Sequence, residues 1–324
     1  MKRILLTGSS GCIGKATVKH LLNLGVERIY GYNRTEPDHE QMPDFEHLPG
    51  DISDTKRLNE VFQEVDPDCL IHLAALQTPD CQAQPFLGME VNLLATAQLF
   101  KTAALYGKSL KRFVFASSAA VHGPRDRHPQ RRIGPDASYN PPNLYGFWKI
   151  AGEGMAQAFN KETQISTVCL RLATTYGPGR DLGLTSASTT ALKARVLGLD
   201  YTIPYHGNEH YHFVEDVGLG FAVVATSDFN GYGVFHLPGE TYPIEEYCKH
   251  ILNISKNIGL ESDSKISYDK EGPSMPFASD LDHAPTLKIF PKMKLTPLIY
   301  GIEKSLLAFK EQMLDGRLSE ENII

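Results

Sequence analysis

The chain has 324 residues, a net charge of −6 and an ordinary composition, with 42% hydrophobic and 22% charged residues. This composition excludes a disordered, collagen-like or coiled-coil protein, and the acidic balance argues against a nucleic-acid partner. The five cysteines form no Cys-x-x-Cys pair, which indicates a reduced, cytoplasmic chain without a disulfide framework. Apolar runs all fall short of the roughly 18 residues of a membrane span, so we expect no membrane association.

Short apolar runs alternate with amphipathic stretches over the first two-thirds of the chain. We expect strands at 3–6, 28–32, 69–73, 112–116 and 166–172. We expect helices between and after these strands, at 12–24, 54–65, 88–105 and 144–160. Strands that alternate with helices predict an α/β fold in which a parallel sheet is covered by helices on both faces.

A glycine-rich turn follows the first expected strand and opens the first expected helix. Its three glycines have separate uses, because one permits the tight turn, one lets the backbone approach a pyrophosphate and one lets the helix pack on the strand. Free N–H groups at the start of the helix then face the anion. We therefore predict dinucleotide contacts at Gly8, Ser10, Gly11, Cys12, Ile13 and Gly14.

A glycine-rich turn at this place is typical of a doubly wound parallel sheet of the Rossmann type, and we predict this fold. We assign residues 1–175 to a dinucleotide-binding domain, with a return segment near 210–235. After about residue 176 the pattern loosens and glycine and proline become frequent at the joints. We therefore expect a smaller, irregular substrate-binding lobe at 176–324.

The end of the second expected strand bears on the choice of cofactor. An NAD-preferring site usually places an acidic residue there, which accepts hydrogen bonds from the adenosine ribose. This chain has Asn33 and then Arg34, and an arginine at this place can pair with the 2′-phosphate of NADP. The cofactor is thus NAD or NADP, with NADP favoured, and the alternative is that Arg34 is an ordinary loop charge.

Tyr145 and Lys149 are four residues apart in the last expected helix, so their side chains share one face. A nearby cation favours the phenolate form of a tyrosine, which can then take a proton from a hydroxyl group. Chance alone yields about one such Tyr-x-x-x-Lys match, and Tyr300 with Lys304 is a second one, which we interpret as a surface pair. Ser118 distinguishes the first pair, because it follows a strand whose end lines the expected ligand crevice.

These motifs resemble the extended short-chain dehydrogenase/reductase family, within it the NAD-dependent epimerase/dehydratase group. The resemblance covers roughly residues 1–240 and consists of signatures in the family's order. They are the turn at 7–14, Gly50-Asp51-Ile52, His72-Leu73-Ala74-Ala75, Asn92, Ser117-Ser118, Tyr145 with Lys149, the stretch at 171–179 and Val214-Glu215-Asp216-Val217.

The resemblance implies roles for individual residues. Ser118 would orient the reacting hydroxyl or carbonyl, Tyr145 would be the acid/base, and Lys149 would hold the cofactor ribose and tune Tyr145. Tyr145 would also contact the cofactor, and further cofactor contacts would come from Asp51, Ile52, Leu73, Ala74, Ala75 and Asn92. The resemblance also implies a homodimer formed through the helices at 88–105 and 144–160.

Departures from the family pattern narrow the chemistry. Family dehydratases carry an Asp-Glu pair after the catalytic serine or threonine, whereas Ala119 and Ala120 follow Ser118 here. Ala119 also replaces the cysteine that fucose-synthase-like members use for epimerisation at carbon. These alanines argue against 4,6-dehydration and leave a 4-epimerase or a 4-keto reductase of a nucleotide-linked sugar.

The substrate side departs from the pattern too. Thr174 stands where sugar-nucleotide members have asparagine, and Glu209 stands where they have an arginine that pairs with the substrate diphosphate. A carboxylate in that place would repel a diphosphate, and Lys193 and Arg195 are the cations that we expect to compensate. His122 replaces a common family tyrosine and would border the site. We therefore predict substrate contacts at His122, Thr174, Lys193 and Arg195.

Two other functions stay open. The first is an NAD(P)-dependent dehydrogenase or reductase of a smaller, non-nucleotide hydroxyl or keto compound, which Thr174 and Glu209 favour. The second is a non-catalytic nicotinamide-sensing protein, against which the retained serine, tyrosine and lysine argue. No metal is expected, since His206, His210 and His212 lack a typical completing ligand set.

Overall fold

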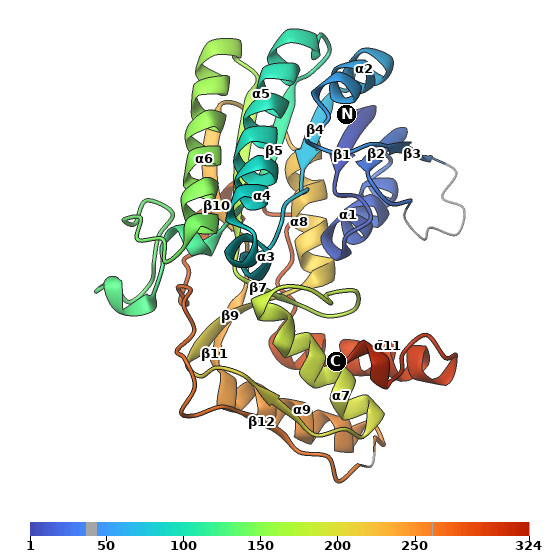
Figure 1. The fold of residues 1–324 in the computed structure, drawn as a ribbon, viewed down its shortest axis with the longest axis vertical. Coiled ribbons are helices and arrows are strands. Elements are labelled where there is room, and N and C mark those ends of the chain that lie inside the picture. Colours follow the sequence, from blue (N-terminus) through green and yellow to red (C-terminus); the bar gives the residue numbers. More distant parts are fainter. Residues whose placement is uncertain (37–43, 261, 324) are drawn as a thin grey trace.

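The computed structural model describes residues 1–36, 44–260 and 262–323 (Figure 1). Its large sheet has seven parallel strands in the order β10-β6-β5-β4-β1-β2-β3. The strands are β1 (Arg3–Thr7), β2 (Arg28–Asn33), β3 (Phe45–Pro49), β4 (Cys69–His72), β5 (Arg112–Ser118), β6 (Ser166–Leu172) and β10 (Tyr232–His236). The strand order reverses between β1 and β4, and a crevice for a ligand forms at the carboxyl ends of the strands on either side of such a point.

Helices cover both faces of this sheet (Figure 1). Alternate residues of β1 face opposite sides, so Leu5 packs in the core under α2 (Thr55–Val65), α5 (Ala95–Tyr106) and α6 (Leu144–Thr163). Ile4 and Leu6 pack in the core on the other face, under α1 (Cys12–Asn23) and α8 (Val214–Thr226). The predicted doubly wound α/β fold is confirmed.

The helix expected at 88–105 is interrupted, which corrects the prediction. The structure has α4 (Pro85–Met89), a π-helical turn over Glu90–Leu94 and then α5. The wider turn accompanies the inward placement of Asn92, whose amide bonds both the N–H and the carbonyl of Leu76. Apolar spacing carries no signal for such a turn, because the helical period changes over a few residues only.

The second part of the chain has smaller sheets. β7 (Thr174–Tyr176), β9 (Asn208–Phe213) and β11 (Glu240–Pro243) form one, while β8 (Tyr201–Ile203) and β12 (Ile266–Tyr268) form another. The second part also contains α7 (Ala187–Leu197), α9 (Ile244–Asn257), α10 (Ala284–Ile289) and α11 (Leu298–Leu314), while the short helix α3 (Thr78–Ala83) follows β4. No helix in the described ranges combines the length and the apolar character needed to cross a membrane.

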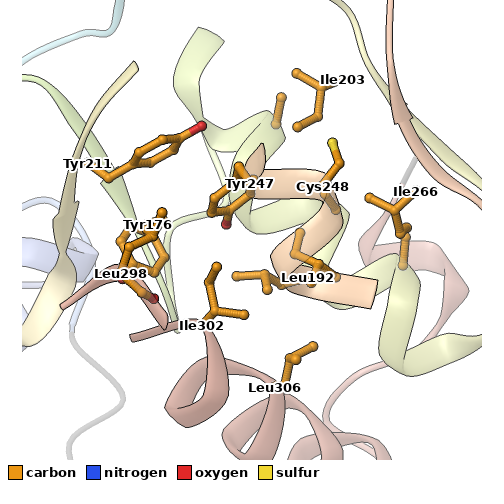
Figure 2. Close-up of a cluster of buried hydrophobic side chains, with 14 of the residues drawn as sticks. Tyr176, Leu192, Ile203, Tyr211, Tyr247, Cys248, Ile266, Leu298, Ile302 and Leu306 are labelled. Atoms are coloured by element: carbon orange, nitrogen blue, oxygen red, sulfur yellow. The ribbon is translucent and has the colours of Figure 1, made fainter. Parts of the chain in front are cut away.

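An aromatic cluster forms the core of this second part (Figure 2). The rings of Tyr211 and Tyr247 are stacked 4.7 Å apart, and Tyr176 meets both edge-on. Leu192 of α7 and Ile302 of α11 pack in the same cluster and are fully buried. Burial of each such side chain contributes roughly 1.5–3 kcal/mol, so the cluster holds α7, α9 and α11 on the small sheet.

Candidate active site

A cleft with a volume of about 640 Å³ opens at the carboxyl ends of the large sheet's strands. Sixteen of the residues that the sequence predicts for cofactor binding and catalysis line it. These are Gly8, Ser10, Gly11, Cys12, Ile13, Gly14, Asn33, Arg34, Asp51, Ile52, Leu73, Ala74, Ala75, Ser118, Tyr145 and Lys149. The fold therefore brings together residues from six separate segments of the chain.

The glycine-rich turn has the geometry that a dinucleotide diphosphate needs. Gly8 has φ +75°, and a Cβ atom there would come within 2.8 Å of the Ala74 nitrogen. A Cβ atom on Gly14 would come within 2.3 Å of the Gly8 carbonyl oxygen, so neither position accepts a side chain. Gly11 caps α1 without a side-chain hydrogen bond, which leaves the first N–H groups of the helix available to an anion. These residues fit the diphosphate of NAD(P).

The ribose end of the cleft holds Asn33 and Arg34. The Asn33 amide donates hydrogen bonds to the Ser10 hydroxyl and to the Thr35 carbonyl oxygen. The Arg34 side chain is 72% exposed, and its Nε lies 3.8 Å from Oδ2 of Asp51. Arg34 thus directly follows β2, as expected, and forms an ion pair with the Asp51 carboxylate.

The catalytic candidates meet where β5 ends and α6 begins. Asn143 caps α6 by accepting a hydrogen bond from the Gly146 nitrogen, at 3.1 Å. The Lys149 ammonium donates to the carbonyl oxygen of Ala116 in β5, at 2.7 Å, and lies 5.5 Å from the centre of the Tyr145 ring. This arrangement puts the phenol and the ammonium beside Ser118, the last residue of β5.

Burial shifts both titratable groups toward their neutral forms. It raises the pKa of Tyr145 to about 12, against the hydrogen bond with Ser118 and the positive charge of Arg180, which both lower it. Burial also lowers the pKa of Lys149 to about 8. The phenol therefore holds its proton at neutral pH, and an added positive charge beside Tyr145 would favour the phenolate.

Glu153 supports this site, and sequence reasoning missed it. Its Oε1 accepts hydrogen bonds from the Ser117 hydroxyl at 2.5 Å and from Nε of Arg171 at 2.7 Å. Arg171 also donates from Nη2 to Oε2, at 2.8 Å, and both side chains of this ion pair are buried. Glu153 follows Tyr145 and Lys149 at the same four-residue spacing on α6, and this spacing is the sequence signal that could have identified it.

None of the four predicted substrate contacts is among the residues that line the cleft. His122 is fully buried beside His236, with 2.9 Å between their Nε2 atoms, and beside Arg171. Thr174 is buried and donates its hydroxyl hydrogen bond to Glu209, at 2.9 Å. These two polar side chains satisfy partners inside the protein, as buried polar groups generally must.

The two cations of α7 are also occupied elsewhere. The Lys193 ammonium pairs with Asp181, and the Arg195 guanidinium donates to Ser255, Ser262 and Ser264. Most of α7 is buried, so its basic residues lie among protein groups instead of at a ligand surface. Sequence spacing alone could not give this outcome, because the partners come from other parts of the chain.

Glu209, which the sequence predicts to face a substrate diphosphate, does not line the cleft. It is buried and accepts hydrogen bonds from the hydroxyls of Thr174, Ser188 and Tyr205, and burial raises the pKa of its carboxyl group. Asn92 lies beside the cleft wall and holds Leu76 instead of lining the cleft itself.

Two further patterns in the sequence lie outside the cleft. Tyr300 and Lys304 are on α11, where the Tyr300 side chain is exposed, as expected for a surface pair. In the part of the chain that the structure describes, no group of three or more His, Cys, Asp or Glu residues could hold a metal ion.

Some residues line the cleft that the sequence did not single out. They come from the loop after β4, from β7 and the loop that follows it, and from a distant segment: Gln77, Thr78, Thr175, Arg180, Asp181, Thr185 and Phe277. Arg180 lies in the glycine- and proline-rich joint at 177–183, so the composition of this joint was the available signal.

Comparisons with known proteins agree with this architecture. The family model "NAD dependent epimerase/dehydratase family" matches residues 4–235. A UDP-glucose 4-epimerase of Halalkalibacterium halodurans is 32% identical over 52% of this chain and 49% of that protein. A dTDP-glucose 4,6-dehydratase of Escherichia coli is 26% identical over 80% of this chain and 74% of that protein.

The same fold occurs in a solved structure of UDP-glucose 4-epimerase from Thermus thermophilus in complex with NAD. Its TM-score is 0.81 at 22% identity, over 95% of this chain and 99% of that one. The family model covers more than half of this chain and includes the glycine-rich turn, Ser118, Tyr145 and Lys149. The chain belongs to the NAD-dependent epimerase/dehydratase family, within the extended short-chain dehydrogenases/reductases.

Proposed function

We propose that this protein transfers hydride between NAD(P) and a sugar hydroxyl or keto group of a nucleotide-linked sugar, as a 4-epimerase or a 4-keto reductase. The observation that carries the proposal is the convergence of Ser118, Tyr145 and Lys149 at the inner end of a cleft built for a dinucleotide. The family relatives that act on nucleotide sugars support the substrate class.

Tyr145 moves the proton in this reaction. When bound, an oxidised nicotinamide supplies the hydride acceptor. As the phenolate, which nearby positive charge favours, Tyr145 would take the hydroxyl proton and become the phenol as the hydrogen on the same carbon leaves as hydride. In the reverse direction the phenol would return that proton to the keto oxygen. Ser118 holds the reacting oxygen beside Tyr145 by a hydrogen bond.

Lys149 orients the site and helps to set the charge on Tyr145. An ammonium group carries three N–H donors, so the bond to Ala116 still allows Lys149 to donate to a ribose hydroxyl. Its positive charge lies over the Tyr145 ring, where it favours the phenolate over the phenol. Lys149 thereby links cofactor binding to proton transfer.

The proposal excludes 4,6-dehydration. Ala119 and Ala120 are buried and line the cleft directly after Ser118, and a methyl group cannot transfer a proton. Elimination of water from a 4-keto sugar requires an acid and a base beside C5 and C6. The carboxylates that line the cleft are Asp51, Asp80, Glu90 and Asp181, all on other segments.

The cofactor preference is a proposal as well. Arg34 is exposed at the ribose end, and we infer that it favours NADP by pairing with the 2′-phosphate. The charge of Asp51 next to it opposes a second anion, so we expect a modest preference. The ratio of NADPH to NADH affinity, measured for the wild type and for Arg34→Gln, tests this inference, and an unchanged ratio would contradict it.

A second candidate is a smaller hydroxyl or keto substrate without a nucleotide. It is favoured by the placement of Lys193 and Arg195, because these predicted partners of a substrate diphosphate are bound to protein groups. The reaction at Ser118, Tyr145 and Lys149 would be the same, since it needs only a secondary alcohol or a ketone.

Product analysis tests the proposed function. The protein is incubated with UDP- and dTDP-linked hexoses and NAD(P), and products are identified by NMR spectroscopy. We expect a C4 epimer, or a change between hydroxyl and keto at C4. A 4-keto-6-deoxy product would contradict the exclusion of dehydration, and turnover of free hydroxy or keto compounds alone would establish the second candidate.

A further inference from the structure

The loop between β7 and α7 contributes residues to the lining of the cleft, next to the glycine-rich turn. Its glycines Gly177, Gly179 and Gly183 have φ angles of +119°, +82° and +98°, a conformation that other residues rarely adopt. A Cβ atom on Gly179 would lie 3.4 Å from the Cβ atom of Cys12, the first residue of α1. The glycines thus let this loop lie against the start of α1.

Arg180 extends from this loop into the cleft wall. Its Nη2 donates to the Thr185 hydroxyl at 3.2 Å. Its positive charge lies near the Cys12 thiol and lowers the pKa of that thiol, although burial raises this pKa overall. Its Nε is buried and finds no hydrogen-bond partner among the described residues. A buried charged donor without a partner is costly, so a ligand acceptor at this place would stabilise it.

The charge of Arg180 is not neutralised by its neighbours. Asp181 follows it directly, but the Asp181 carboxylate pairs with Lys193. No carboxylate of the described residues lies within ion-pair distance of Arg180. The other arginine that lines the cleft, Arg34, is paired with Asp51 at 3.8 Å. Arg180 is therefore a net positive group beside the start of α1.

We propose that Arg180 binds a diphosphate in this cleft, with its guanidinium donating to phosphoryl oxygens. A guanidinium matches phosphate oxygens with paired N–H donors, and the free N–H groups of α1 favour the same anion. The close approach of Gly179 to Cys12 puts Arg180 beside the start of α1, which favours the diphosphate of the dinucleotide over that of a nucleotide-linked substrate. This inference rests on the proposed dinucleotide cleft and adds a cofactor-binding residue to it.

Direct binding measurements test the proposal without any turnover. ADP-ribose is titrated into nucleotide-free wild type, Arg180→Gln and Arg180→Lys, and UDP is titrated into the same proteins loaded with NAD. Arg28→Gln is the matched control, because Arg28 is exposed at the opposite end of β2 from the cleft. AMP is the ligand control, because it lacks a diphosphate.

We expect Arg180→Gln to weaken ADP-ribose binding roughly tenfold or more, as loss of a charge-assisted hydrogen bond does, with a smaller loss for Arg180→Lys. Arg28→Gln should bind as the wild type does, and AMP should not distinguish the proteins. A loss confined to UDP would assign Arg180 to the diphosphate of the substrate.

Unchanged binding of both ADP-ribose and UDP to Arg180→Gln, with a wild-type melting temperature, would overturn the proposal. An equal loss for AMP would overturn it too, because the effect would not depend on a diphosphate. If Arg180→Gln unfolds, Arg180→Lys carries the test, since it keeps the charge and loses the paired donors. Failure of the proposed sugar chemistry would leave ADP-ribose binding intact, so the two results are distinguishable.

Discussion

The hydroxyl of Ser117 donates a 2.5 Å hydrogen bond to the Glu153 carboxylate, and this contact ties the end of β5 to α6. Ser117 precedes the catalytic Ser118, and Glu153 lies one helical turn after Lys149. Arg171 of β6 completes the contact through its buried ion pair with Glu153. One carboxylate thus fixes three elements that together position the reacting groups.

Glu153→Gln should therefore lower both stability and turnover. The variant keeps the size of the side chain but leaves the buried charge of Arg171 without a counter-charge, which typically costs about 3–5 kcal/mol. We expect kcat to fall more than KM rises, because Glu153 positions Ser118 and Lys149 and does not touch substrate. Urea unfolding and steady-state kinetics check this, and a loss of stability below about 1 kcal/mol would contradict it.

Two glycines of α6 provide a matched pair. A Cβ atom on Gly146 would come within 2.8 Å of the Ala120 carbonyl oxygen, whereas one on Gly154 would meet nothing within 4 Å. Gly146→Ala should push the start of α6 away from β5, separate Tyr145 from Ser118 and lower kcat. Gly154→Ala should keep wild-type kcat and raise stability by roughly 0.5–1 kcal/mol, as alanine does in helices. Equal kcat values for the two variants would show that the close approach at Gly146 is unimportant.

We expect the free energy of unfolding to fall in mild acid, because the folded protein buries several histidines in their neutral form. Burial lowers the pKa of His72 to about 3, of His122 to about 3 and of His212 to about 4. An unfolded histidine titrates near about pH 6.5, so below that pH the unfolded chain binds more protons than the folded chain. The stability that is present above pH 6.5 is then lost as pH falls toward the folded values, by up to about 1.4 kcal/mol per pH unit for each group.

Urea unfolding at about pH 7.5 and about pH 5.5 measures this loss, and equal stability at the two values would contradict it. His122→Gln should reduce the slope of stability against pH, because it removes one of the titrating groups.

The helices α5 and α6 lie side by side in Figure 1, and we predict that the protein forms a homodimer through their outer faces. Leu105 of α5 and Phe147 of α6 are more than half exposed, and their burial against a second copy would be favourable. We propose that two copies pair through these faces. Sedimentation should show a dimer, and Leu105→Glu with Phe147→Glu should give a monomer. Leu314→Glu, at a still more exposed position on α11, should remain dimeric, and a monomeric wild type would contradict the proposal.

The sequence predicted the elements and residues whose signals are local. The apolar run at Ser166–Leu172 has the bounds of β6, and Ser118, Tyr145 and Lys149 were placed together because strand ends and helical spacing fix their positions. The burial of Glu209 was not predictable in this way, because its partners come from three different segments. The serine partners of Arg195 were not predictable for the same reason, since a basic residue shows its partners only after the chain has folded.

The central claim is that Tyr145 transfers the proton that accompanies hydride transfer. Tyr300 supplies a matched control, because Tyr300 and Lys304 have the same spacing on α11, away from the cleft. On the substrate that product analysis identifies, we expect Tyr145→Phe to lower kcat roughly 100-fold or more, with a much smaller effect on cofactor affinity, and Tyr300→Phe to match the wild type. Wild-type kcat for Tyr145→Phe would contradict the account.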